Sequence, residues 1–279
     1  ALVANARGGA VIRAIDTLNE RHLAPFTKKN FKDVLVQCDQ YGVDHRSLFD
    51  ATALMMAARA GNVALVQALL ERGADLEVRD LFGHTPVMHA LERAALDAVY
   101  AAGPFAAIYA QVAPRALDVE TDGRLIRLYP HQGEYFLLLT MLANLKTLGS
   151  QLVPQNVCPL HRRSGFNTAW LMRNLEHVAH SVLREERRKR TWFNAVLARA
   201  EVGSAYQPAR RLWMRSRNGF YVPNPTLRVQ VLGGDGQNEW QSWQEAMKLR
   251  LVLAGIGAGE TGLVLEDLLP RQANDSPAV

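Results

Sequence analysis

Basic side chains are concentrated in one part of the sequence. Residues 162–217 contain 13 Lys and Arg against 4 Glu, a net charge of +9 in a chain whose total is +5, so the rest carries −4. The densest part is the run 184–190. Guanidinium and ammonium groups gathered in this way typically face phosphates or an acidic partner. We expect ten of them to contact nucleic acid: Arg173, Arg184, Arg187, Arg188, Lys189, Arg190, Arg210, Arg211, Arg215 and Arg217.

The same pattern has a second interpretation. Glu185 and Glu186 lie close enough to residues 188–190 for ion pairs worth only about a few tenths of a kcal/mol each. A charge run of this kind is usually a solvated helix face, and its partner could equally be an acidic protein surface. Nearby aromatic residues would stack on single-stranded bases or belong to the core: Trp192, Trp213, Phe220 and Tyr221.

Groups that could catalyse a reaction are sparse. Cys158 and His161 form an isolated Cys-x-x-His with no second pair to complete a zinc site. Acid and base groups lie about one helical turn apart in two places, as eight histidines produce by chance: His131 with Glu134, and Glu176 with His177 and His180. The glycine-rich segment 255–259 lacks the Lys of a phosphate-binding loop, and no Gly-x-Ser-x-Gly or His-Glu-x-x-His occurs. We therefore predict no catalytic residue, no metal, no cofactor and no small-molecule substrate.

Composition is that of an ordinary globular protein. The chain has 279 residues, of which 48% are hydrophobic and 21% charged, enough for about two domains. The only cysteines, Cys38 and Cys158, lie too far apart in sequence to suggest a disulfide framework, which favours a reducing, cytoplasmic location. No apolar stretch is long enough to cross a membrane, and no secretory signal is visible.

One segment of the acidic N-terminal part recurs at a fixed interval. Residues 48–54 read Leu-Phe-Asp-Ala-Thr-Ala-Leu and residues 81–87 read Leu-Phe-Gly-His-Thr-Pro-Val, which places Thr52 and Thr85 33 residues apart. Together with the small residues and glycines between the copies, this period resembles the ankyrin repeat family over roughly residues 31–100. The resemblance implies a stack of paired helices that bind a protein, because these arrays are scaffolds for recognition.

The residue types in the repeat fit that architecture. Thr52 can begin an inner helix, and Gly61 allows a tight turn into an outer helix over 63–72, which Gly73 closes in a left-handed conformation. Pro86 then opens the next inner helix, where its missing N–H costs nothing. Upstream, apolar spacing predicts a helix over 10–22 and a second one, capped by Thr27 and ending near Gly42, which would act as a degenerate half repeat.

The resemblance also implies which residues meet a partner. In ankyrin proteins the usual contact surface is the row of hairpin tips and the adjacent face of the inner helices. By position this surface contains Leu48, Phe49, Arg59, Arg79, Leu81, Phe82, His84, Glu92 and Arg93. Two exposed Leu-Phe pairs need a cover. That cover is a protein partner or the C-terminal domain of this same chain.

Beyond residue 113 the pattern changes to a mixture of strands and helices. Hairpins are predicted over 117–128, with Asp-Gly at the turn, and over 211–222, with Asn-Gly at the turn. Between them we expect a buried helix over 135–148 and a helix from Asn167 or Thr168, which is either one long basic helix or two helices meeting near Arg184. A strand over 227–231 and a helix over 240–254 follow. The element order over 117–222 resembles a winged-helix DNA-binding domain, with residues 215–221 as the wing.

The sequence thus predicts a mainly α fold with a C-terminal α+β part: an ankyrin stack followed by a basic, winged-helix-like domain. The expected divisions are residues 1–113, residues 114–271 and a disordered tail, 272–279. The predicted function is a non-enzymatic adaptor or regulator that binds a protein and nucleic acid. The alternatives are a purely protein-binding subunit of a larger complex and an unrecognised nucleic-acid-processing enzyme.

Overall fold

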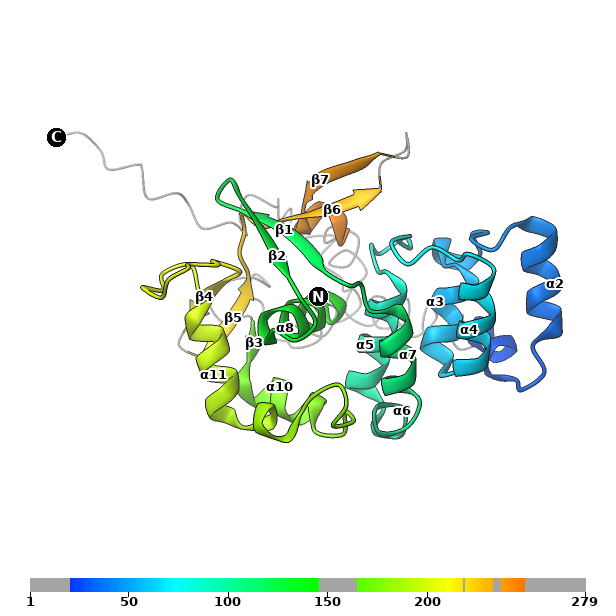
Figure 1. Cartoon of the computed structure of the whole chain (residues 1–279), viewed down its shortest axis with the longest axis horizontal. Coiled ribbons are helices and arrows are strands. Elements are labelled where there is room, and N and C mark those ends of the chain that lie inside the picture. The colour runs from blue at the N-terminus through cyan, green and yellow to red at the C-terminus, as the bar shows by residue number, and fades with distance from the viewer. Residues whose placement is uncertain (1–20, 146–164, 218, 233–236, 249–279) are drawn as a thin grey trace, which may run out of the picture.

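The structure is a computed structural model that describes residues 21–145, 165–217, 219–232 and 237–248. The predicted helix over 10–22 falls mostly outside these ranges. The Cys158 and His161 pair, the segment 255–259 and the tail 272–279 lie outside them altogether. The repeat helices lie on one side of the molecule, and the C-terminal elements gather around one central helix on the other (Figure 1).

The predicted helix pair of the first repeat is confirmed. Helix α3 (Ala53–Ala60) is the inner helix and α4 (Val63–Glu71) the outer one. The Thr52 hydroxyl accepts from the backbone N–H of Met55, so the inner helix begins at Thr52 as the sequence suggested, and the Asn62 side chain caps the outer helix by accepting from the N–H of Leu65. Gly61 between the helices has φ +80°, which is the left-handed conformation expected of it.

The N-terminal cap is shorter than expected. Helix α2 (Lys32–Tyr41) ends at Gly42 as predicted, but it begins five residues later than Thr27. Thr27 instead ends a short 3-10 turn, η1 (Ala24–Thr27), and its hydroxyl donates to the carbonyl of Ala24. The Thr27 side chain is therefore used upstream and is not the helix cap.

The second repeat is continued by three helices: α5 (Pro86–Leu96), α6 (Ala98–Ala102) and α7 (Phe105–Val112). Asp97 ends α5 and caps α6, because its carboxylate accepts from the N–H groups of Val99 and Tyr100. The inner helix α5 is buried along residues 86–92. It packs against α3 on one side and against helices of the C-terminal part on the other.

The C-terminal part holds two small antiparallel sheets. The first has the order β2-β1-β6-β7, and its strands are β1 (Leu117–Thr121), β2 (Arg124–Leu128), β6 (Arg228–Leu232) and β7 (Asn238–Ser242). The second has the order β3-β5-β4, and its strands are β3 (Phe166–Asn167), β4 (Trp213–Arg217) and β5 (Phe220–Pro223). Both predicted hairpins form, with positive φ at Asp122 and Gly123 in one turn and at Gly219 in the other.

The predicted helix over 240–254 is wrong at its start. Residues 238–242 pair with β6 as strand β7, and within the described residues up to 248 the short α12 (Trp243–Ala246) follows. Ser242 caps α12 through a reciprocal bond with Glu245. The strand forms because its neighbour β6 offers a free edge, which local helical spacing cannot reveal.

Of the two alternatives for the basic region, the structure has two separate helices and not one long helix. Asn167 caps α10 (Thr168–Leu175) through the N–H of Trp170, but the chain leaves helical geometry soon after Leu175. The run 184–190 includes a 3-10 turn, η3 (Glu185–Arg188), and α11 (Arg190–Arg199) begins at its end.

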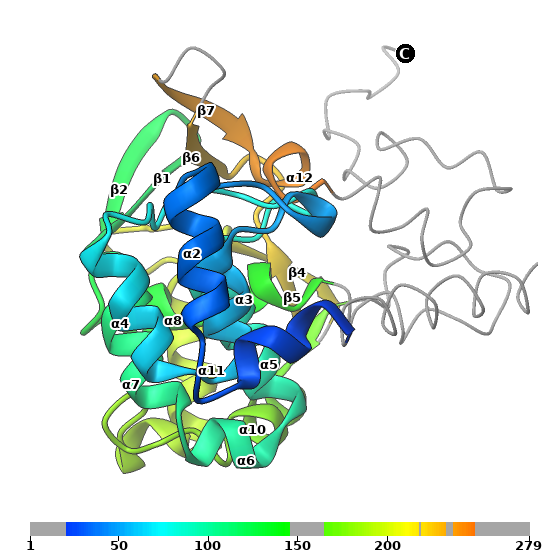
Figure 2. The same cartoon turned by 90° about the vertical axis from the view of Figure 1, so that its right-hand side faces the viewer.

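Helix α8 (Gly133–Ala143) is the centre of the C-terminal part. All of its residues are buried, and it packs against α5, α11 and β5 (Figures 1 and 2). Buried apolar side chains on both sides of residue 113 belong to one continuous cluster. The expected domain boundary at 113 and the winged-helix identity stay predictions.

Candidate interaction surfaces

The hairpin tips of the two repeats lie side by side. The Phe49 and Phe82 rings are 5.8 Å apart between centroids, and the N–H of Leu81 donates to the carbonyl of Phe49 across 2.9 Å. Leu48 is 37% exposed and Leu81 41% exposed. The tips therefore form one apolar surface, which we name the tip ridge: Leu48, Phe49, Leu81 and Phe82.

Two residues of the first tip, Phe49 and Asp50, have a backbone conformation that favours glycine. Phe49 and Asp50 both have φ +58° in the short 3-10 turn η2 (Leu48–Asp50), whereas the residue one period beyond Asp50 is Gly83, with φ +80°. Left-handed geometry in residues with a Cβ costs about 1–2 kcal/mol each. Such strain gathers at binding sites, where the side chains are needed in that geometry.

The second tip is partly covered by the C-terminal part of the same chain. A Cβ at Gly83 would overlap the carbonyl oxygen of Ala246 and would lie 2.8 Å from the Cα of Met247. The sequence left open whether a partner or the chain itself covers the tips. At Gly83, the cover is the chain itself.

Two arginines one period apart make equivalent contacts along the row of tips. Arg46 donates to the carbonyl of Asp50 and also to that of Arg79 in the next unit. Arg79 donates to the carbonyl of Gly83 across 2.8 Å and to that of Gln230 in β6 across 3.2 Å. The backbone of β6 thus supplies the acceptor that a further repeat would supply. Arg79, which was expected to meet a partner, is used to hold β6.

The expected contact residues on and beside the inner helices are buried or have partners within the chain. Arg59 donates to Glu92 across 2.6 Å, and their side chains are only 16% and 7% exposed. Arg93 pairs with Asp97 across 2.8 Å, and His84 is buried. The expectation that Glu92 and His84 lie at the surface is wrong, because the C-terminal part closes over α5.

A buried polar cluster underlies the second tip. Asp80 accepts from the N–H groups of Phe82 and His84 through Oδ1, and its Oδ2 lies 3.0 Å from Nε2 of His89. Burial alone would raise the pKa of Asp80, but its bonds with His89 and the neighbouring histidine charges outweigh this and lower the pKa to about 2. Asp80, His84 and His89 are the one group of three potential metal ligands among the described residues. Because N–H groups already engage both carboxylate oxygens, we assign the cluster a structural role.

The basic residues fall into two classes. Among the ten candidates, five have partners within the chain: Arg187 with the carbonyl of His131, Arg188 with three carbonyls, Arg210 with Glu134, Arg211 with Asp122 and Arg215 with Glu201. Four are exposed and make no ion pair with another described residue: Arg173, Arg184, Lys189 and Arg190. The side chain of Arg217 is outside the described set. The charge available to a ligand is therefore smaller than the sequence indicates.

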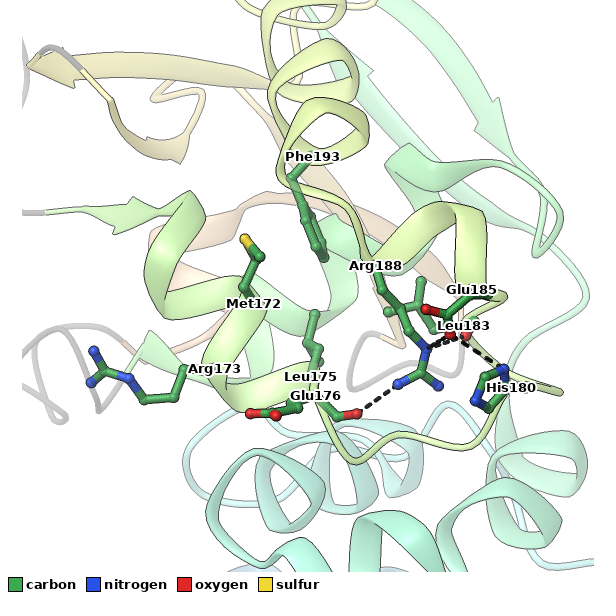
Figure 3. Close-up of a pocket in the computed structure, with 9 residues that line it drawn as sticks. All are labelled: Met172, Arg173, Leu175, Glu176, His180, Leu183, Glu185, Arg188 and Phe193. Carbon is green, nitrogen blue, oxygen red and sulfur yellow. Dashed lines mark hydrogen bonds and ion pairs between the residues drawn. The ribbon is translucent and has the colours of Figure 1, made fainter.

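Arg188 holds the segment between α10 and α11 together. Its guanidinium donates to the carbonyls of Glu176, Val178 and Leu183, and the side chain is only 17% exposed. Figure 3 shows its bond to Glu176 and its ion pair with Glu185. This residue lines a pocket of about 560 Å³. Leu175, together with Leu183 and Phe193, supplies apolar side chains to the lining. We conclude that Arg188 stabilises the chain turn and is not available to bind phosphate.

Sequence reasoning missed a polar group at the start of α8. Glu134 is buried and pairs with Arg199 across 2.9 Å and with Arg210 across 3.3 Å. These arginines lie 65 and 76 residues along the chain from Glu134, so no local motif could have joined them. His131, once paired with Glu134 on spacing alone, is exposed and stacks on Tyr129.

Comparison with known proteins identifies part of the chain. Residues 24–101 match a family model described as ankyrin repeats (3 copies). No curated protein and no solved structure matches the chain. Among the described helices, none has both the length and the apolar character needed to cross a bilayer.

Proposed function

Residues 24–101 are ankyrin repeats, and we propose that this chain is a non-enzymatic adaptor that binds a protein partner through the tip ridge. Ankyrin repeats form a protein-interaction module. The proposed adaptor acts in the cytoplasm. In this proposal residues 1–113 recognise the partner, and residues 114–271 carry a basic surface.

The single observation that carries this proposal is the geometry of the first tip. Leu48 is exposed, and Phe49 and Asp50 hold strained left-handed conformations beside it. The second inner helix, α5, is buried under the C-terminal part, so it offers a partner little surface. The tip ridge is the part of the expected contact surface that keeps exposed apolar side chains.

The test is co-purification of a partner with the tagged full chain from its host after chemical cross-linking. The double variant Leu48→Ser and Leu81→Ser should lose that partner, because it removes the exposed apolar groups of the ridge. The matched control is Leu96→Ser with Leu125→Ser, since both leucines are 64% exposed and lie away from the tips. Equal recovery of the partner with both double variants would contradict the proposal.

Thermal melting separates binding from folding in this experiment. Exposed leucines contribute little to the folded core, so the ridge variant should melt within about 2 °C of the wild type. A much larger drop would mean that the ridge caps the fold and does not meet a partner.

A second candidate function is contact with nucleic acid through the unpaired basic residues. Arg184, Lys189 and Arg190 are exposed on one short segment and make no ion pair with the other described residues. This supports a phosphate-binding strip, although it is smaller than the whole basic region.

The test measures binding of single-stranded and duplex DNA as a function of salt. Replacing Arg184, Lys189 and Arg190 with Ala should weaken binding uniformly across sequences and flatten the salt dependence. The matched control replaces Lys28, Lys29 and Lys32, which removes the same charge from exposed positions in the repeat part of the chain. If both triple variants show the same DNA binding, or if the chain binds an acidic protein and no DNA, the purely protein-binding alternative is favoured.

A further inference from the structure

A pocket of about 290 Å³ lies where the first turn of α8 meets α11. Three guanidinium groups line it, from Arg187, Arg199 and Arg210, and two aromatic side chains complete its walls, Trp192 and Tyr206. The pocket is therefore built from segments far apart in sequence.

Two of these arginines form ion pairs with Glu134. It is buried and pairs with Arg199 and Arg210, whose side chains remain 38% and 26% exposed. The Arg199 guanidinium also lies over the Tyr206 ring, 5.5 Å from its centroid. A guanidinium has five N–H donors, and these contacts hold the group in place while leaving donors for a ligand.

Arg187, in the 3-10 turn η3, is the third arginine of the lining. It donates to the carbonyl of His131 across 2.8 Å and lies 5.8 Å from the Trp192 ring centroid, with no carboxylate paired to it among the described residues. The Trp192 ring can approach because residue 133 is glycine, where a Cβ would lie 2.6 Å from Cζ2 of the indole. The arginine is thus positioned before any ligand arrives.

From this arrangement we propose that the pocket binds a small phosphate monoester. Three arginines and one glutamate leave a net charge of +2, and a phosphate monoester carries a charge of about −1.5 to −2 at pH 7. A phosphodiester carries only one negative charge, so the charge balance favours a monoester over a nucleic-acid backbone. The volume also leaves room for an organic group beside the phosphate.

A second pocket, lined by residues around Arg188, lacks this charge preference. The pocket in Figure 3 carries Arg173 and Arg188 against Glu176 and Glu185, which balance, and Arg188 is already engaged by backbone carbonyls. These charges give no reason to expect an anion there. The α8 pocket differs because its arginines outnumber its carboxylate.

The experiment is isothermal titration of the full chain with inorganic phosphate, AMP, O-phosphoserine and cyclic AMP. Inorganic phosphate should bind, and AMP should bind about tenfold or more tightly than cyclic AMP, which has the same base and sugar but one charge less. Tighter binding of AMP than of O-phosphoserine identifies a nucleotide as the source of the phosphate. The reverse order identifies a phosphorylated amino acid.

Variants assign the binding to this pocket. Arg187→Ala should weaken AMP binding about tenfold or more, because it removes one of the three guanidinium groups that line the pocket. The control Arg124→Ala removes an exposed arginine that does not line the pocket and should leave binding unchanged. Equal binding of AMP and cyclic AMP, or equal losses in Arg187→Ala and Arg124→Ala, would overturn the proposal. Absence of any phosphate binding would do the same, and none of these results bears on the protein-binding ridge.

Discussion

The carboxylate of Glu92 lies 2.6 Å from the guanidinium of Arg59, exactly one repeat period away in sequence. A second pair with the same offset joins Arg72 to Asp39 across 3.2 Å. Stacking in register brings residues one period apart into contact on neighbouring helices. The two pairs differ in burial, which makes them suitable for comparing the energetic value of such bridges.

We predict that Glu92→Gln lowers the free energy of unfolding by about 3 kcal/mol, because it leaves the largely buried Arg59 charge without its partner. Asp39→Asn is the matched control. Its pair is exposed, with Asp39 at 62% and Arg72 at 36%, so the change should cost less than about 1 kcal/mol. Urea denaturation of both variants measures the difference, and similar losses would contradict this account.

We predict that Gly83→Ala destabilises the chain more than Gly73→Ala does. The two glycines have nearly equal φ angles, +80° and +82°, so both substitutions bear the same conformational strain. Only at Gly83 would the new methyl group meet another segment, the backbone at Ala246. The difference between the two unfolding free energies therefore isolates this contact. Hydrogen exchange at 243–247 should accelerate in Gly83→Ala alone.

We predict that Asp80 makes stability depend on acid pH. Its pKa is about 2 in the folded chain and about 3.9 in an unfolded one. A lowered pKa contributes stability that is present above about pH 4 and is lost as the pH falls toward 2. The difference in unfolding free energy between the wild type and Asp80→Asn should therefore shrink by about 2 kcal/mol between about pH 5 and pH 2. A difference that does not change with pH would show that His89 does not lower this pKa.

We predict that Arg188→Ala loosens the turn between α10 and α11. The change removes the donor shared by the carbonyls of Glu176, Val178 and Leu183 and should cost about 3 kcal/mol. Limited proteolysis should then cut within 176–189. Arg184→Ala, an exposed change four residues earlier, should alter stability by less than about 0.5 kcal/mol. Equal protease resistance in the two variants would show that Arg188 does not hold this turn in place.

Local signals account for the elements that the sequence predicted. The helix pair α3 and α4 follows from its caps and from Gly61, and the hairpin β1–β2 follows from the Asp-Gly turn. In both cases neighbouring residues supply the decisive interactions. The family match over residues 24–101 confirms the repeat that the 33-residue period indicated.

Elements fixed by distant contacts were not predictable. The apolar spacing after Asn167 suits a continuous helix, but Arg188 folds back onto the carbonyls that follow Leu175. Strand β7 forms because β6 lies beside it. The arginine pocket depends on Glu134, which meets its partners only through the tertiary fold. Charge density in the sequence pointed to the right region but could not separate paired arginines from free ones.

The bond from Arg79 to the carbonyl of Gln230 limits how many repeat units this stack could gain. An open solenoid can lengthen by duplicating a unit at its end. Here that end is already occupied, since β6 takes the acceptor role of the next tip and Ala246 fills the space above Gly83. Inserting another unit after residue 96 would have to displace the sheet, so the length of this array is tied to the part that follows it.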